Sequence, residues 1–285
     1  GLALFALSCV LSLLFSRARA DSLRVLVIFF TGFLFCYLTA FNFDRRDALR
    51  TLLGFLYVSL LLVCCAAIAQ RAFHLISVNS SYTDTRINAG VPARVYGTLD
   101  NPANLSGFIQ LFLPLSAAYA ISADRSWKRA ALSLGLLIPL LAMVMTYARA
   151  GWVSVLLAAC ILVYFSEKKV IPLLVLAGIL CIPLLPQSIL IRLGTIGNSI
   201  DSSTAHRLAL WKGVLLMLKD YGLGGIGLGP DTFELLYPDY AQLGAKTGAY
   251  HSQMLYMELL LELGLLGFLS FLWTMLRSEE HTSEL

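Results

Sequence analysis

Long apolar runs separated by short polar connections dominate the chain. Most runs have about the 20 residues that a helix needs to cross a hydrocarbon core about 30 Å thick. Because helices satisfy their own backbone groups in lipid, the pattern predicts an all-α polytopic integral membrane protein with about eight transmembrane helices. The apolar segments lie at about 1–15, 25–41, 51–69, 106–123, 130–148, 152–166, 170–186 and 252–276.

Two long polar stretches, at about 70–105 and 187–251, interrupt this pattern. The second is far longer than a usual connection, which is typical of a functional extramembrane region. Lys and Arg in the connections favour, by nine residues to seven, the orientation in which both stretches lie outside the cytoplasmic membrane. We therefore expect membrane helices over 1–186 with a shorter outer loop at about 70–105, and a large loop over 187–251.

The two ends of the chain are unusual. The first run, 1–15, lacks a basic leader and a cleavage site, so it is interpreted as part of a membrane helix and not as a signal peptide. The last membrane helix is expected over 252–276. The polar tail at 277–285 shows no helical periodicity and is expected not to be native.

The large loop contains a predicted helix followed by a glycine-dense turn. Apolar residues recur every three or four positions over 204–221, at Leu208, Trp211, Leu215 and Leu218, as in an amphipathic helix. Gly222 should end this helix, and the glycines of 222–229 should form a turn closed by Pro230. Since no strand precedes these glycines, they do not form a dinucleotide fingerprint.

Composition agrees with a membrane protein. Hydrophobic residues make up 58% of the chain and charged residues 13%, and the mean hydropathy is +0.77, which excludes a water-soluble globule. The net charge of +4 is small and its cations lie between apolar runs, so no nucleic-acid partner is expected. No metal-ligand spacing is present, and the cysteines, all within apolar runs, are interpreted as buried small apolar residues: Cys9, Cys36, Cys64, Cys65, Cys160 and Cys181.

Four cationic or titratable residues at the ends of membrane segments are candidates for chemistry: Arg94, Arg149, Arg207 and His251. Arginines gathered near the outer leaflet are suited to bind a pyrophosphate, because each guanidinium can donate a forked pair of hydrogen bonds to phosphate oxygens. A nearby histidine can take a proton from an attacking hydroxyl. The alternative is that each arginine is an interfacial anchor and that the histidine is hydrogen-bonded at an interface.

Two carboxylates add to this set. Glu258 and Glu262 lie four residues apart and therefore on one face of the last predicted helix. They are suited to acid-base chemistry, but helix packing or pairing with an arginine explains their position equally well.

The sequence resembles the O-antigen ligase and polymerase superfamily over about residues 90–276. Six motifs in the same order carry the resemblance: Arg94-Val-Tyr-Gly-Thr-Leu-Asp-Asn-Pro-Ala-Asn104, Thr146-Tyr-Ala-Arg-Ala-Gly-Trp152, Arg207-Leu-Ala-Leu-Trp211, Gly225-Ile-Gly-Leu-Gly-Pro-Asp231-Thr-Phe, His251-Ser-Gln-Met-Leu and Glu262-Leu-Gly-Leu-Leu-Gly. Two positions depart from the family pattern, which usually has Ser where Ala148 stands and Asn where Ser252 stands.

The resemblance implies a polytopic glycosyltransferase-like enzyme of the bacterial inner membrane with a large periplasmic loop. It implies metal-independent, inverting transfer of a glycan from undecaprenyl pyrophosphate to a hydroxyl of lipid A-core, without a cofactor. Arg149 and Arg207, together with Arg94, would then bind the pyrophosphate, and His251 would act on the acceptor. Asn104, Asp231, Glu258 and Glu262 would be supporting residues.

Other functions stay open at this stage. A polymerase that joins two lipid-linked repeats, or a ligase that glycosylates protein hydroxyls, would use the same donor. A lipid-glycan transporter is the main alternative of another class, but such proteins usually have internal repeats, and the chain shows none. A structural scaffold would leave the placement of the arginines and the histidine unexplained.

Overall fold

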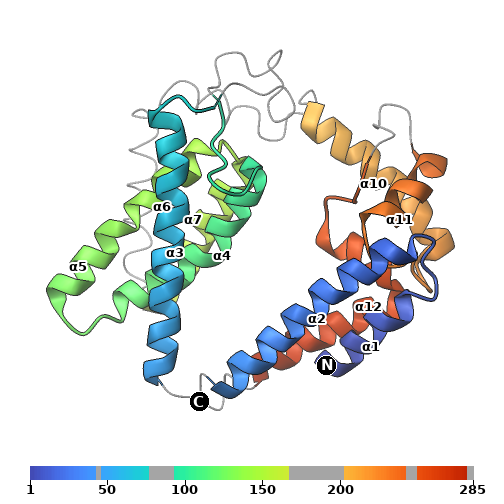
Figure 1. Ribbon diagram of the computed structural model, residues 1–285, viewed down its shortest axis with the longest axis horizontal. Coiled ribbons are helices and arrows are strands. Elements are labelled where there is room, and N and C mark those ends of the chain that lie inside the picture. Colours follow the sequence, from blue (N-terminus) through green and yellow to red (C-terminus); the bar gives the residue numbers. More distant parts are fainter. Residues whose placement is uncertain (43–45, 77–92, 167–201, 242–248, 281–285) are drawn as a thin grey trace. The chain divides into compact units, whose positions relative to one another are not determined.

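The computed structural model describes residues 1–42, 46–76, 93–166, 202–241 and 249–280. Within these residues the regular structure is helical (Figure 1). The chain divides into two compact units, which are described separately: Phe43–Asn198, and Gly1–Asn42 together with Ser199–Leu285.

Among the described residues, five helical segments are long and apolar enough to cross a membrane: Arg19–Thr39, Asp47–Ala72, Pro102–Ile121, Ser126–Met145 and Leu255–Arg277. The prediction of a helical polytopic membrane protein is confirmed, and the described part of the chain shows five such segments, whereas about eight were predicted for the whole chain. The predicted segments at 1–15 and 152–166 form the shorter helices α1 (Leu2–Ser12) and α7 (Arg149–Ser166). The predicted segment at 170–186 lies outside the described residues.

The unit Phe43–Asn198 is built around α3 (Arg46–Ala72), which packs against α4 (Pro102–Ile121) and α6 (Leu137–Met145). The short helix α5 (Ser126–Gly135) precedes α6, and α7 packs against α4. The start of α4 is capped by the Asn101 side chain, whose oxygen accepts the Ala103 N–H at 2.8 Å. The core residues are Leu60, Cys64, Ala67, Val95, Leu105, Ile109, Leu113, Ala142 and Met143.

The other unit contains α1, α2 (Arg19–Asn42), α10 (Ser202–Tyr221), α11 (Pro230–Leu236), a 3₁₀ turn η3 (Tyr237–Tyr240) and α12 (Leu255–Glu280). α1 lies alongside α12 (Figure 1). Small residues allow this close approach, since the hydroxyls of Ser8 and Ser270 are 3.4 Å apart. The ring of Phe5 packs against rings from both neighbouring helices, including Phe33 and Phe271.

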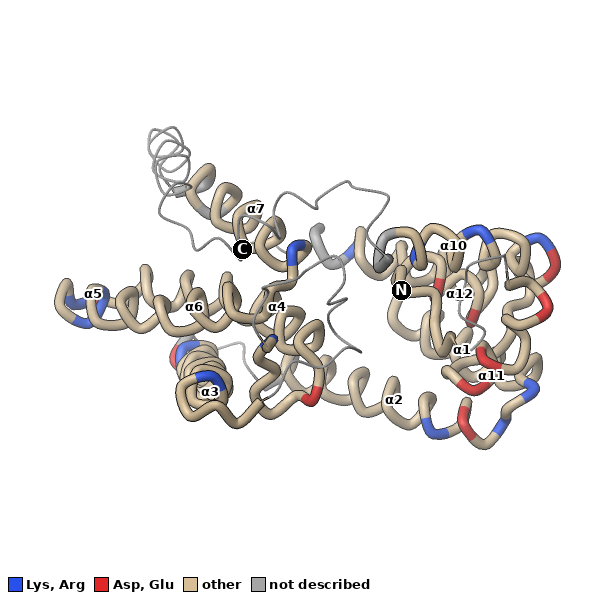
Figure 2. The backbone as a smooth tube through the Cα atoms, turned by 90° about the horizontal axis from the view of Figure 1, so that it is seen from above, with Lys and Arg blue, Asp and Glu red and all other residues tan. Residues whose placement is uncertain are grey.

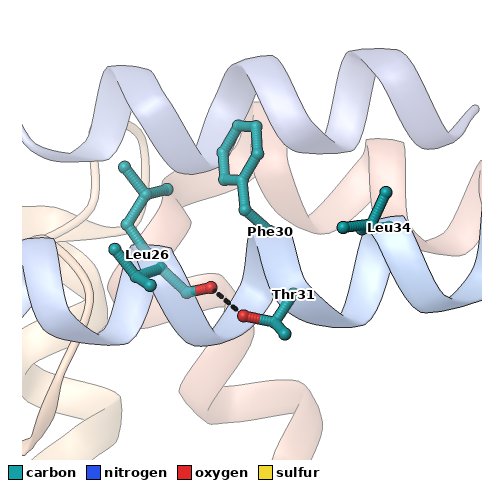
Figure 3. A pocket seen from close by; sticks show the side chains of 5 residues that line it. Leu26, Phe30, Thr31 and Leu34 are labelled. Carbon is teal, nitrogen blue, oxygen red and sulfur yellow. Dashed lines mark hydrogen bonds between the residues drawn. The ribbon is translucent and has the colours of Figure 1, made fainter.

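The outward face of α2 is suited to hydrocarbon. Figure 2 shows charged residues at the start of this helix and none along the part that follows. A shallow apolar groove runs along it, lined by Leu26, Val27, Phe30, Thr31 and Leu34 (Figure 3). The hydroxyl of Thr31, the polar side chain among them, donates to the Val27 carbonyl at 2.6 Å, so the groove presents little unpaired polarity.

The last helix, α12, is broken. Gly264 has φ 69° and ψ −176°, which interrupts the helical backbone between Leu255 and Glu280. A side chain rarely adopts this positive φ, so glycine is required here. The helix also continues past Leu276, where the last membrane helix was expected to end, as far as Glu280.

The helix predicted over 204–221 is confirmed as α10, which ends at Tyr221, immediately before Gly222. Its buried face is only partly the predicted one, since Trp211 and Leu218 are half-buried. Leu208 and Leu215 are 45% and 51% exposed, whereas Leu210, Val214 and Met217 are buried. The predicted cysteine burial is also only partly right, because Cys9 and Cys64 are buried while Cys36 and Cys65 are exposed.

Candidate functional site

The predicted site residues fall into two groups, one in each unit. Arg94, Asn104 and Arg149 belong to Phe43–Asn198. The other unit contains Arg207, Asp231, His251, Glu258 and Glu262. Each group has a structured turn at its centre.

In Phe43–Asn198, the centre is the turn between α6 and α7. The Nε of Arg94 donates to the Thr146 carbonyl at 2.7 Å, and Val95 N–H donates to the Met145 carbonyl at 3.3 Å. Tyr147 has a φ of 52°, which reverses the chain so that α7 begins at Arg149. The fold thus brings two cations that are distant in sequence to one turn.

The same turn is stabilised by its own side chains. The buried Thr146 hydroxyl donates to the Met143 carbonyl at 2.7 Å and accepts the Ala148 N–H at 3.2 Å. The Trp152 indole donates to the Met143 carbonyl at 3.1 Å. The turn therefore forms without a side-chain hydroxyl at position 148, where the family usually has Ser.

The segment that carries Arg94 is fixed by the end of α3. Gln70 donates to the Gly97 carbonyl at 2.6 Å, and its side-chain oxygen accepts the N–H groups of Gly97 at 2.9 Å and Tyr96 at 3.4 Å. Asn104 follows on the first turn of α4, where it is exposed. Arg149 is half-buried at the N-terminus of α7, so its charge adds to the positive end of the helix dipole. Such a place favours a bound anion.

In the other unit, the centre is the turn 251–254 that precedes α12. His251 is exposed, whereas Ser252 is fully buried. The Trp211 indole donates to the Ser252 carbonyl at 3.0 Å, and the Ser252 N–H donates to the carboxylate of Glu258. The Nε of Arg207 donates to the side-chain oxygen of Gln253 at 3.1 Å. Arg207 is thus bound to the turn that contains His251.

Both carboxylates of α12 accept backbone N–H groups. Glu262 is 8% exposed, and its Oε1 accepts the Gly229 N–H at 2.9 Å, while Glu258 accepts the Ser252 N–H. Within the described residues neither carboxylate forms an ion pair with an arginine, which was one of the two alternatives from sequence. Their observed role is to anchor the chain segments before α11 and before α12.

The glycine-dense segment 222–229 packs against the break in α12. Ile226 N–H donates to the Leu261 carbonyl at 2.8 Å, and Gly227 N–H donates to the Glu262 carbonyl at 3.1 Å. The break leaves helix carbonyls without partners, and this segment supplies the missing N–H groups. At Gly225, with φ +81°, a Cβ would lie 2.6 Å from the Glu262 carbonyl oxygen. Gly225 is therefore explained by close backbone packing.

Asp231 lies at the end of this segment, in the first turn of α11. Its side chain is exposed, and its N–H donates to the carboxylate of Asp21 on α2 at 3.1 Å. The contact ties the start of α11 to α2. Asp231 has no hydrogen bond to the turn at 251–254.

A model of the family described as O-antigen ligase matches residues 134–272. These residues resemble that family and form the O-antigen ligase region of the chain. No protein of curated function and no solved structure matches the chain. The family match and the apolar helices together make the protein a multi-pass membrane protein with a glycosyltransferase-like region.

The O-antigen ligase region contains most of the candidate residues. Arg149, Arg207, His251 and the two carboxylates of α12 lie within it, whereas Arg94 and Asn104 precede it. Arg94 is nevertheless connected to the region, because the Thr146 carbonyl that it binds lies inside the match.

Sequence reasoning missed three residues that position the segments carrying the candidate residues: Gln70, Trp211 and Gln253. Trp211 had a usable signal, because it lies four residues after Arg207 and therefore on the same face of α10. Gln70 had only the signal of an amide at the polar end of an apolar run. Gln253 has a φ of 57°, and nothing in its sequence context indicates this conformation.

Proposed function

We propose that the protein is a glycan ligase, which transfers a glycan from undecaprenyl pyrophosphate to a hydroxyl of lipid A-core at the periplasmic face of the inner membrane. One observation carries the proposal. Within the O-antigen ligase region, a cation on α10 is hydrogen-bonded to the turn that contains the histidine, since Arg207 binds Gln253, two residues after His251.

The proposed role of the arginines is to bind the donor pyrophosphate. Arg207 uses its Nε to bind Gln253, so its two terminal nitrogens remain oriented as a donor pair for phosphate oxygens. Arg149, at the positive end of α7, and Arg94, bound to the same turn as Arg149, supply further positive charge. These charges stabilise the negative charge that grows on the leaving group.

The proposed role of His251 is that of general base. Its imidazole takes the proton of the acceptor hydroxyl as the oxygen forms a bond to the anomeric carbon. The bond from that carbon to the pyrophosphate oxygen breaks, and undecaprenyl pyrophosphate leaves with the electron pair. Attack opposite the leaving group inverts the anomeric configuration. Glu258 and Glu262 anchor the surrounding backbone and do not touch the reacting atoms in this scheme.

Complementation tests this function. The full open reading frame and its His251→Ala variant are expressed in one host that lacks its O-antigen ligase and in another that lacks its O-antigen polymerase. We expect the lipopolysaccharide ladder on a gel to return only in the first host, and only with the unaltered protein. Restoration only in the second host would make the protein a polymerase. Restoration in neither would reject lipid A-core and repeat units as acceptors and favour a protein acceptor or transport.

A further inference from the structure

We propose that Glu258 is the positioning residue for His251, and that it acts together with Trp211 through the peptide groups of Ser252. The proposal rests on the proposed function, in which His251 accepts the proton of the acceptor hydroxyl. It assigns to the start of α12 a role in the reaction, although neither Glu258 nor Trp211 contacts substrate in this scheme.

The backbone of Ser252 is held from two helices. On one side its N–H donates to the Glu258 carboxylate from α12, and on the other its carbonyl accepts the Trp211 indole N–H from α10 at 3.0 Å. Ser252 is fully buried, so water does not compete for these groups. Because the His251 Cα is joined directly to the peptide that carries the Ser252 N–H, holding this peptide restricts ψ of His251 and so limits the directions in which the imidazole can leave the chain.

The remaining contacts of the turn complete this arrangement. The Ser252 hydroxyl donates to the Met254 carbonyl at 3.0 Å and accepts the Met254 N–H at 3.2 Å, which closes the turn on itself. Gln253 is held at a φ of 57° while its side chain binds Arg207. One rigid turn therefore sets the positions of both His251 and the acceptor atom for Arg207.

A carboxylate is well suited to this task. Glu258 lies in the first turn of α12, where a negative charge is stabilised by the helix dipole. A hydrogen bond to an ionised acceptor is also stronger than one between neutral groups, and here it holds a buried donor that would otherwise be unsatisfied. Ser252 stands where the family usually has Asn, so in this chain the turn depends on backbone contacts and on a short hydroxyl.

The experiment combines transfer kinetics with hydrogen exchange on the purified full chain in detergent. The variants are Glu258→Ala, which removes the acceptor, Glu258→Gln, which keeps an acceptor oxygen, and Trp211→Phe, which removes only the indole donor. Glu234→Ala, on α11 of the same unit, is the matched control. Amide exchange of residues 250–254 measures the turn directly and does not depend on turnover.

For Glu258→Ala we expect exchange of the Ser252 amide to rise by about 10-fold to 100-fold and kcat to fall by a similar factor. The KM for the lipid-linked donor should change by less than about 3-fold, because Arg207 is retained. Glu258→Gln should recover most of kcat and of the protection. Trp211→Phe combined with Glu258→Ala should reduce kcat by less than the product of the single effects, because the two residues hold the successive peptide groups on either side of the Ser252 Cα.

Four outcomes would overturn the proposal. Two concern Glu258 alone: a normal kcat in Glu258→Ala, or no recovery of kcat in Glu258→Gln although the Ser252 amide of that variant is protected from exchange. The other two are a loss of kcat in Glu234→Ala equal to that in Glu258→Ala, and fully multiplicative effects on kcat in the double variant. The failure of the proposed function looks different. In that case the unaltered protein transfers no glycan, or His251→Ala transfers it normally, while the exchange data still report whether Glu258 holds the turn.

Discussion

Two connecting segments, 93–99 and 222–229, are both fixed without forming helices, but by different means. The first is held mainly by the Gln70 side chain, which makes three hydrogen bonds to the backbone of Tyr96 and Gly97. The second is held by the backbone of α12, whose carbonyls at the break accept N–H groups from Ile226 and Gly227. A side chain supports the segment before α4, and a broken helix supports the segment before α11.

This difference decides how each segment responds to substitution. A side-chain support can be removed by one change that leaves the neighbouring backbone as it was. A backbone support leaves no room for a side chain, so it depends on glycine at the points of closest approach. The segment 222–229 should therefore fail through steric conflict, and the segment 93–99 through lost hydrogen bonds.

The largest expected effect is in the backbone-supported segment. Gly225→Ala places a Cβ at a φ of +81°, 2.6 Å from the Glu262 carbonyl oxygen, so we expect a loss of about 3–5 kcal/mol in the free energy of unfolding. Gly224→Ala is the matched control, because its Cβ would only meet the Phe15 ring at 3.6 Å. Thermal unfolding in detergent measures both. Equal melting temperatures for the two variants would refute the backbone support.

The next effect concerns activity and compares the two turns. Arg207→Lys and Arg149→Lys keep the charge but lose the forked donor geometry, so we expect each to reduce glycan transfer by about 100-fold. The control is Arg277→Lys, which lies exposed in the last turn of α12. Transfer assayed with purified lipid-linked donor is the measurement. If only one of the two variants loses activity, only the turn that contains it binds the donor.

Much of the fold could be predicted from sequence, because helix lengths and helix ends have local causes. α10 ends immediately before Gly222, and the glycine segment ends at Pro230, as turn chemistry predicts. The hairpin before Arg149 is likewise present where a short connection joins two apolar runs. Local rules sufficed at these points because each residue acts on its own backbone.

The features that were missed depend on contacts between distant segments. The break at Gly264 lies in an apolar run, where hydropathy does not change, and its N–H and carbonyl partners lie some forty residues earlier in the chain. The buried face of α10 was placed on Leu208 and Leu215, because Leu, Val and Met occur around the whole helix. Packing against α12 and η3 selects Leu210 and Val214 instead.

The side-chain-supported segment should show a smaller effect than the glycine segment. Gln70→Ala removes three hydrogen bonds, two of them short, so we expect a loss of about 2–3 kcal/mol in stability. Transfer should fall because the segment carries Arg94. Gln70→Glu keeps the acceptor for the Gly97 N–H and loses the donor to the Gly97 carbonyl, so it should fall between Gln70→Ala and the unaltered protein. Melting temperature and transfer rate are measured together, and a larger loss in Gln70→Glu than in Gln70→Ala would contradict this account.

The smallest expected effect is that of a chelator. The described residues contain no group of three or more His, Cys, Asp or Glu side chains arranged to hold a metal ion. In the proposed mechanism the arginines of both turns stabilise the charge on the leaving pyrophosphate, which is the task that a divalent cation performs in many other transferases. EDTA should therefore leave the transfer rate unchanged, and added Mg²⁺ should not raise it. A rate that falls with EDTA and recovers with Mg²⁺ would mean that the arginines alone do not neutralise the charge of the donor pyrophosphate.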